Sequence, residues 1–221
     1  MGFDRRLALL WLLYFCQGLP GGFLAVALPV ILLEQGVELA KVGLVSLLSL
    51  PWLLKVLWAP LVDRYGSPSF GRRKSWMVPA MVAMIACALA IAALDPITML
   101  PAVLVWFIAL NLCAATQDIA VDGFAVSLMR GRELGPANSA QIGGFKLGNL
   151  FGGGVLLALS GTLGWTVVFV IMAGCIALAL VAVLRADEPA PPGDAVPVHT
   201  ASVIRRALGE LVREPVYAVF L

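Results

Sequence analysis

Four charged side chains lie inside stretches of this sequence that are otherwise apolar: Lys55, Asp118, Asp122 and Lys146. A charge in hydrocarbon costs about 2.5–3.5 kcal/mol on insertion scales, so each one indicates a charged partner, a wet cavity or both. Two acids balance two bases, so we expect the four side chains to meet. They form either an ion-pair cluster that fixes helix packing or a solvated path that binds a solute or relays a proton.

The two acids also share a helical face. Asp118 and Asp122 are four residues apart, and Asn111 lies seven residues before Asp118 on the same face. Like charges one turn apart repel each other, so the two carboxylates need cations nearby. We expect Asp118 and Lys55 to be functional, and Asp122, the acid nearest the interface, to be structural. One hypothesis is that one of the two carboxylates titrates during transport.

A stripe of glycines precedes and follows Lys146. Gly144, Gly148 and Gly152 repeat every four residues, a pattern that lets two helix backbones approach closely. Lys146 is about 200° round the helix from Gly144, with Asn149 and Gly153 near its own face. We therefore expect one side of this helix to pack tightly and the opposite side to be polar.

Two further segments could face a ligand. QGLPGG, residues 17–22, places Pro and three Gly near the middle of an apolar stretch, which predicts either a packing kink or a ligand-facing break. Trp52, Lys55 and Trp58 are spaced by three, so aromatic faces flank a cation. That strip either stacks on a solute or anchors the helix at the membrane interface.

These residues belong to a chain too apolar to be water-soluble. Hydrophobic residues are 61% and charged residues 13%, against about 45–50% and about 25% in soluble domains. The net charge of +2 gives no reason to expect nucleic acid, and one His with four scattered Cys excludes a zinc module or a disulfide scaffold. No nucleophile and base have a catalytic spacing, so we expect no enzyme, metal or cofactor.

The elements that position these residues are apolar segments of about 20 residues, long enough to cross a bilayer. Charge, Gly or Pro separates them. The sequence predicts an all-α, polytopic membrane protein in which residues 1–185 form a six-helix bundle, with spans at 7–33, 39–62, 76–94, 100–128, 138–159 and 165–184. Residues 186–213, rich in Pro, Asp and Gly, predict a cytoplasmic linker with a possible short amphipathic helix. Residues 214–221 are apolar, and we expect them to begin a seventh helix of a longer protein.

The basic residues predict the orientation, because Lys and Arg accumulate in cytoplasmic loops. Lys41 alone lies on the odd side of the spans. The even side carries twelve: Arg5, Arg6, Arg64, Arg72, Arg73, Lys74, Arg130, Arg132, Arg185, Arg205, Arg206 and Arg213. Both chain ends are therefore expected in the cytoplasm.

The loop between the second and third spans carries a family resemblance. It reads KVLWAPLVDRYGSPSFGRRKSW, and Asp-Arg followed by Gly-Arg-Arg resembles the signature loop of the major facilitator superfamily. Two departures are Pro60, where the family usually has Gly, and a longer stretch between Gly66 and Gly71. Together with QGLP, KVLWAPLVD and ATQDIAVDG, in order across residues 17–123, these departures resemble the branch of AmpG muropeptide permeases and acetyl-coenzyme A transporters.

That resemblance implies a transporter of two six-helix bundles that works by alternating access and is usually driven by protons. This chain would supply the amino-terminal bundle, two inverted three-helix repeats, and a carboxy-terminal bundle would be missing. By the same resemblance Asp63, Arg64, Arg72 and Arg73 are gate or latch residues, and the path for solute and protons includes motif positions in three spans: Gln17, Lys55, Gln117, Asp118 and Asp122. To these we add Asn111, Lys146 and Asn149 from their positions on the spans.

The resemblance favours a bacterial AmpG-like permease in the cytoplasmic (inner) membrane that imports anhydro-muropeptide-type cell-wall fragments. Three alternatives remain open: a carrier of acyl-coenzyme A or drug-like solutes, a half-size membrane partner that does not transport, and a membrane enzyme such as an acyltransferase. The partners expected are a small solute, protons and the lipid bilayer.

Overall fold

The structure is a computed structural model and describes residues 2–67, 69–129 and 131–188. All regular structure in those ranges is helical, as the sequence predicts. By length and composition four helices can cross a membrane: Phe3–Glu34, Lys74–Ala92, Leu100–Leu128 and Gly131–Leu184. The predicted amphipathic helix and seventh helix lie outside the described residues.

The first span runs through α1 (Phe3–Gly22), a π-helical segment η1 (Phe23–Ala27) and α2 (Leu28–Glu34) without interruption. Of the two alternatives for QGLPGG, a packing kink or a ligand-facing break, the break is therefore wrong. Pro20 lies inside the helix, and the backbone widens into the π-helical segment directly after the glycines. Wider turns are a usual way for a helix to absorb such a local irregularity.

The second span is the irregular one. It runs in short pieces: α3 (Leu39–Gly43), the 3-10 segment η2 (Leu44–Ser49), α4 (Leu50–Leu54), the 3-10 segment η3 (Lys55–Leu57) and α5 (Ala59–Arg64). Pro51 and Pro60 occupy the first turns of α4 and α5, where a missing backbone N–H costs least. The apolar helical part, Leu44–Leu57, is shorter than the four spanning helices.

The third and fourth spans are regular: α6 (Lys74–Ala92) and α7 (Leu100–Leu128). Asp95 organises the turn between them, because its Oδ1 accepts hydrogen bonds from the backbone N–H groups of Thr98 and Ile97 and from the Thr98 hydroxyl. These bonds, the one from the Thr98 N–H above all, lower the pKa of the Asp95 carboxyl.

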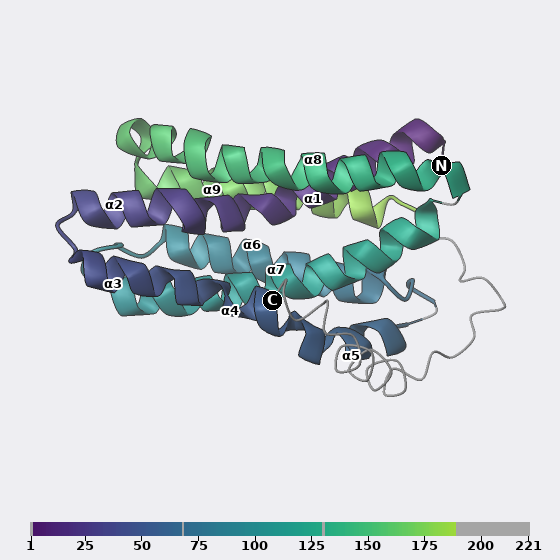
Figure 1. Cartoon of the computed structure of the whole chain (residues 1–221), viewed down its shortest axis with the longest axis horizontal. Coiled ribbons are helices and arrows are strands. Elements are labelled where there is room, and N and C mark those ends of the chain that lie inside the picture. The colour runs from purple at the N-terminus through teal and green to yellow at the C-terminus, as the bar shows by residue number, and fades with distance from the viewer. Residues whose placement is uncertain (1, 68, 130, 189–221) are drawn as a thin grey trace, which may run out of the picture. The chain divides into compact units, whose positions relative to one another are not determined.

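The last helix reverses direction. After the turn η4 (Gly131–Glu133) come α8 (Leu134–Leu150), the π-helical segment η5 (Phe151–Val155) and α9 (Leu156–Leu184). Gly164 has φ 80° and ψ 169°, a conformation open to glycine, and the chain turns back there (Figure 1). The predicted fifth and sixth spans are the two arms of this reversal.

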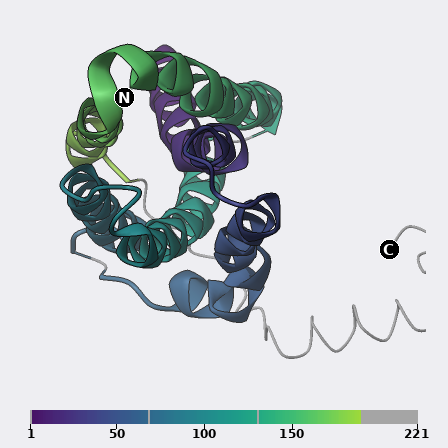
Figure 2. The same cartoon turned by 90° about the vertical axis from the view of Figure 1, so that its left-hand side faces the viewer.

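The helices pack mainly as pairs, α1 with α8 and α6 with both α7 and α9, as the end-on view in Figure 2 shows. An aromatic cluster holds η1, α7 and α9 together: the centre of the Phe23 ring lies 4.9 Å from that of Phe169 and 6.1 Å from that of Phe107. Large apolar side chains such as Leu53 (74% exposed) point outward. An outer surface of this kind suits a lipid environment.

Glycine makes the α1–α8 contact possible. A Cβ atom at Gly148 would lie 2.1 Å from the Phe15 carbonyl oxygen, and one at Gly152 would lie 2.2 Å from that of Leu19. At Gly144 the distance to the Trp11 carbonyl oxygen would be 2.9 Å. The structure thus sets the predicted stripe against the backbone of α1. We call this contact the glycine seam.

Candidate functional site

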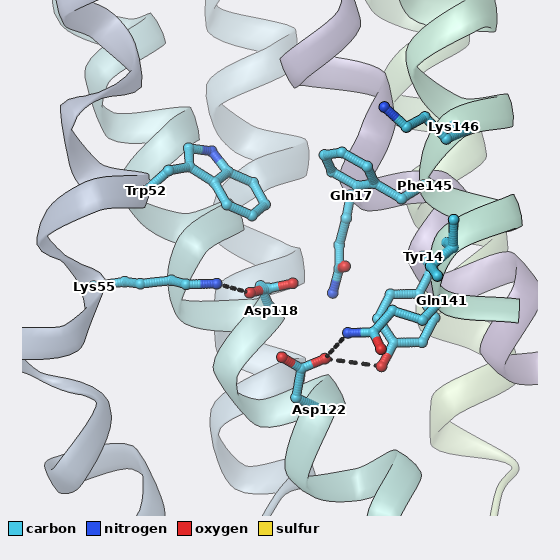
Figure 3. A pocket seen from close by; sticks show the side chains of 10 residues that line it. Tyr14, Gln17, Trp52, Lys55, Asp118, Asp122, Gln141, Phe145 and Lys146 are labelled. Atoms are coloured by element: carbon cyan, nitrogen blue, oxygen red, sulfur yellow. Dashed lines mark hydrogen bonds and ion pairs between the residues drawn. The ribbon is translucent and has the colours of Figure 1, made fainter. Parts of the chain in front are cut away.

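A cavity of about 330 Å³ opens between α1, the second span, α7 and α8 (Figure 3). Helix spacing brings its residues together, since α1 and α8 present side chains one turn apart and α7 contributes two carboxylates one turn apart. The cavity is lined by Tyr14, Gln17, Trp52, Lys55, Asp118, Asp122, Gln141, Ile142, Phe145 and Lys146.

Lys55 and Asp118 form an ion pair across the cavity, from the second span to α7. The Asp118 side chain is only 10% exposed and that of Lys55 is 32% exposed. The Lys55 ammonium also lies 5.3 Å from the centre of the Trp52 ring, so the aromatic face and the carboxylate share the same cation. Burial of this degree leaves the pair weakly screened by solvent.

Asp122 is held by neutral donors instead of a cation. Its Oδ1 accepts hydrogen bonds from the Tyr14 hydroxyl at 2.8 Å and from the Gln141 amide at 3.0 Å. The two neighbouring carboxylates therefore have separate partners on separate helices.

The expected four-charge cluster does not form. Lys146 lines the cavity but is exposed and points away from both carboxylates (Figure 3). It has no ion pair with any of the described residues. The physical reason is that α8 meets α1 through its glycines, which turns Lys146 toward the open part of the cavity.

Two predicted amides support the cavity without lining it. Asn111 accepts a hydrogen bond from the Trp52 indole at 3.1 Å and donates one to the Phe107 carbonyl at 3.0 Å. It therefore fixes the plane of the tryptophan. Asn149 lies in the glycine seam, where its backbone is 2.1 Å from the place of a Gly22 Cβ. Asn149 of α8 and Gly153 of η5 both pack against Gly22 of α1, which corrects the expected polar face.

Gln17 and Gln117 are both fully buried, and none of their side-chain amide atoms has a hydrogen-bond partner among the described residues. Each such buried group costs about 1–3 kcal/mol if it stays unsatisfied. Gln17 lines the cavity and Gln117 does not. The two side chains thus match in chemistry and burial but differ in access to the cavity.

Four lining residues were not predicted from the sequence: Tyr14, Gln141, Ile142 and Phe145. A usable signal was present for two of them, because Tyr14 lies one turn before Gln17 and Ile142 lies one turn before Lys146. Phe145 packs edge-on against Trp52, with ring centres 6.1 Å apart. The aromatic strip predicted on the second span is therefore completed from α8.

Of the four residues predicted to form the latch, two are joined by an ion pair. Asp63 forms an ion pair with Arg73. Arg64 instead lies over the Tyr65 ring, 5.9 Å from its centre. The Arg72 carbonyl accepts a hydrogen bond from the Ser75 hydroxyl at 2.8 Å, and its side chain has no ion pair in the described part of the chain.

Arg73 also explains the glycine of the Asp122-Gly123 pair. Its guanidinium lies against α7, where a Cβ at Gly123 would be 2.2 Å from the Arg73 Cζ. Only glycine admits the guanidinium at this distance. The Asp63–Arg73 pair therefore connects the end of the second span, the start of α6 and the face of α7.

The starts of α1 and α6 and the ends of α5, α7 and α9 lie at the same end of the helices (Figure 1). Arg6 donates a hydrogen bond to the Leu128 carbonyl at 2.5 Å and pairs with Glu133 at 3.2 Å. The start of the predicted linker is also ordered, since the Lys74 ammonium donates to the Ala186 carbonyl at 2.9 Å. Ala186, the first residue of the predicted linker, thus contacts the bundle.

The cavity offers an ion pair, a hydrogen-bonded carboxylate, a buried amide and an exposed ammonium beside two aromatic rings. Such groups bind a polar solute and exchange protons. Across the described ranges they do not form the nucleophile, base and orienting group of covalent catalysis.

A family model described as the Major Facilitator Superfamily matches residues 10–221. The chain is 31% identical over 194 residues to the anhydromuropeptide permease of Escherichia coli strain K12, covering 87% of this chain and 39% of that protein. It is 35% identical over 173 residues to an uncharacterized protein of Haemophilus influenzae, covering 78% and 41%. It is 30% identical over 190 residues to putative transporter AmpG 4 of Rickettsia felis, covering 84% and 46%. The chain spans less than half the length of each of these relatives.

Proposed function

This chain belongs to the Major Facilitator Superfamily, and we propose that it forms the amino-terminal bundle of a proton-coupled permease that imports anhydromuropeptide-type cell-wall fragments. It is an integral, multi-pass membrane protein of a transporter family, not an enzyme family. By the complete carrier we mean this bundle together with the second, carboxy-terminal bundle that the proposal requires. A second bundle in that carrier closes the transport path from the other side.

The Lys55–Asp118 ion pair carries this proposal. It joins two different helices across a cavity rather than within a packed core, so it can open without a loss of helix contacts. Moreover, α1 and α8 are held together independently by the glycine seam. The pair is therefore available as a switch between an occupied and an empty cavity.

The proposed cycle begins when a proton enters the cavity and neutralises Asp118. Lys55 then loses its counter-charge and binds an anionic group of the solute. After the solute leaves, the proton leaves Asp118 and the ion pair forms again. Asp122, held by Tyr14 and Gln141, and the exposed Lys146 are the other ionisable groups that face this exchange.

The Asp63–Arg73 pair is the proposed latch at the cytoplasmic end. Both residues lie at the end of the helices that carries most of the Lys and Arg residues, which supports a cytoplasmic position. Breaking and remaking this pair accompanies alternating access. Similarity to proteins of Escherichia coli and Rickettsia felis supports a location in a bacterial inner membrane.

The cargo is proposed from the relatives. One relative is an anhydromuropeptide permease and another is a putative transporter AmpG 4. The hydrogen-bonding groups and paired aromatic rings of the cavity suit a solute with sugar rings and polar substituents.

Uptake into right-side-out vesicles that hold the complete carrier tests the function. We expect accumulation of radiolabelled anhydromuropeptide that stops when a protonophore collapses the pH gradient. If acyl-coenzyme A competes and anhydromuropeptide does not, the proposed cargo is wrong. If Asp118→Asn and Asp122→Asn each leave uptake and its dependence on the gradient unchanged, proton coupling through these carboxylates is wrong.

A further inference from the structure

The side-chain amide of Gln17 is the one buried polar group of the cavity wall that has neither a charge nor a partner in residues 2–67, 69–129 and 131–188. The residue is 0% exposed, yet its amide points into the space between α7 and α8 (Figure 3). Buried amides in folded proteins are nearly always hydrogen-bonded. An amide left open at a cavity wall is therefore available to a ligand.

The neighbouring acids do not satisfy Gln17, because each already has partners. Asp118 is paired with Lys55, and Asp122 accepts from Tyr14 and Gln141. Gln141, the other glutamine of the cavity, is engaged through its Nε2. Among the described side chains that line the cavity, the Gln17 amide is the one buried group that retains both a free donor and a free acceptor.

A free side-chain amide selects for one kind of group. Its nitrogen donates and its oxygen accepts, and a secondary amide offers both kinds of partner, a carbonyl that accepts and an N–H that donates. A hydroxyl satisfies such a pair less completely, and an ester has no donor.

We propose that Gln17 is a specificity-determining residue that binds a secondary amide of the transported solute. The assignment rests on the proposed carrier function. An acetamido group on a sugar and a peptide bond share this chemistry, so both are candidate sources of the amide. The aromatic pair Trp52 and Phe145 lies on the same cavity and contacts the adjoining ring or chain.

The test is a binding measurement on the purified complete carrier in detergent, with tryptophan fluorescence as the readout. One pair of probes is an acetamido sugar and the same sugar with a hydroxyl in its place. A second pair is a dipeptide and its ester analogue. We expect the natural protein to prefer one amide-bearing probe over its partner by about tenfold. The pair that is discriminated identifies the source of the amide.

Gln17→Met keeps the length of the side chain and removes both polar atoms. We expect it to bind both members of the discriminated pair equally. Gln35→Met is the control, since Gln35 is the same residue type, is exposed and does not line the cavity. We expect the control to keep the tenfold preference.

Equal binding of both members of each pair by the natural protein overturns the assignment. So does a preference that persists in Gln17→Met. If Gln17→Met does not fold, Gln17→Glu replaces it, and a preference unchanged in that variant also overturns the assignment. Binding is measured without a membrane, so a failure to transport leaves this result intact and counts against the carrier function alone.

Discussion

The carboxylate of Glu188 accepts hydrogen bonds from the backbone N–H of Arg73 at 2.9 and 3.1 Å, and from that of Lys74 at 3.0 Å. Glu188 follows α9, and Arg73 and Lys74 begin α6, so the residue caps one helix from beyond the end of another. A carboxylate at this position also interacts favourably with the helix dipole. Gly71, with φ 103°, makes space for the Glu188 carboxylate, because a Cβ atom at this position would lie 2.4 Å from the Glu188 Oε2.

This contact predicts the effect of Glu188→Ala. We expect a loss of about 0.5–2 kcal/mol in stability, because two N–H groups of α6 lose their acceptor. Hydrogen exchange of the amides of residues 73–76 should accelerate. Asp187→Ala removes the same charge from the neighbouring exposed residue and serves as the control. Equal exchange in the two variants would contradict a capping role.

The latch prediction separates two adjacent arginines. Arg73→Ala should slow conformational cycling several-fold with little effect on solute binding, because it breaks the Asp63 pair and leaves the cavity intact. Arg72→Ala should have a smaller effect, since its side chain takes no part in that pair. The measurement compares the rate of solute exchange across the membrane with the affinity for solute, in vesicles that hold the complete carrier. A larger cycling defect in Arg72→Ala than in Arg73→Ala would contradict the assignment of the latch to Arg73.

Charge replacement distinguishes transport from packing at the Lys55–Asp118 pair. Lys55→Met or Asp118→Asn alone should reduce stability by about 1–3 kcal/mol, because one buried charge or its partner is left unmatched. The double variant should recover much of that stability, since neither charge remains. Uptake should stay at least about tenfold below that of the natural protein.

The readouts are thermal unfolding in detergent and solute uptake in vesicles. If the double variant recovers uptake together with stability, the pair is a packing element. Recovery of stability alone supports its role in the transport cycle.

The glycine seam predicts that folding of the bundle depends steeply on the size of the side chain at these glycine positions. Gly148→Ala should separate α1 from α8 or prevent folding, because its Cβ has only 2.1 Å to the Phe15 carbonyl oxygen. Gly174→Ala is the control, since nothing lies within 4 Å of its Cβ position. The amount of monodisperse protein after detergent extraction checks both. Equal amounts would show that the seam tolerates expansion.

The sequence alone determined the spans and the presence of a polar site. Apolar length and the cost of charge in hydrocarbon are local properties, so residues 7–33 or 100–128 and the need of Asp118 for a cation can be read without a fold. That argument predicts a cation beside Asp118 but does not choose between Lys55 and Lys146. The resemblance to the superfamily, drawn from four motifs, is confirmed by the family match.

Tertiary structure decided which partner each polar residue obtained. Periodicity places Asp122 on a helical face, but only packing sets the rotation of α1 and α8 about their axes. That rotation brings Tyr14 and Gln141 to Asp122 and directs Lys146 elsewhere. It also puts Asn149 in the seam, because the glycines beside it admit the backbone of α1. The Glu188 cap joins residues over 100 positions apart, and no local pattern encodes such a contact.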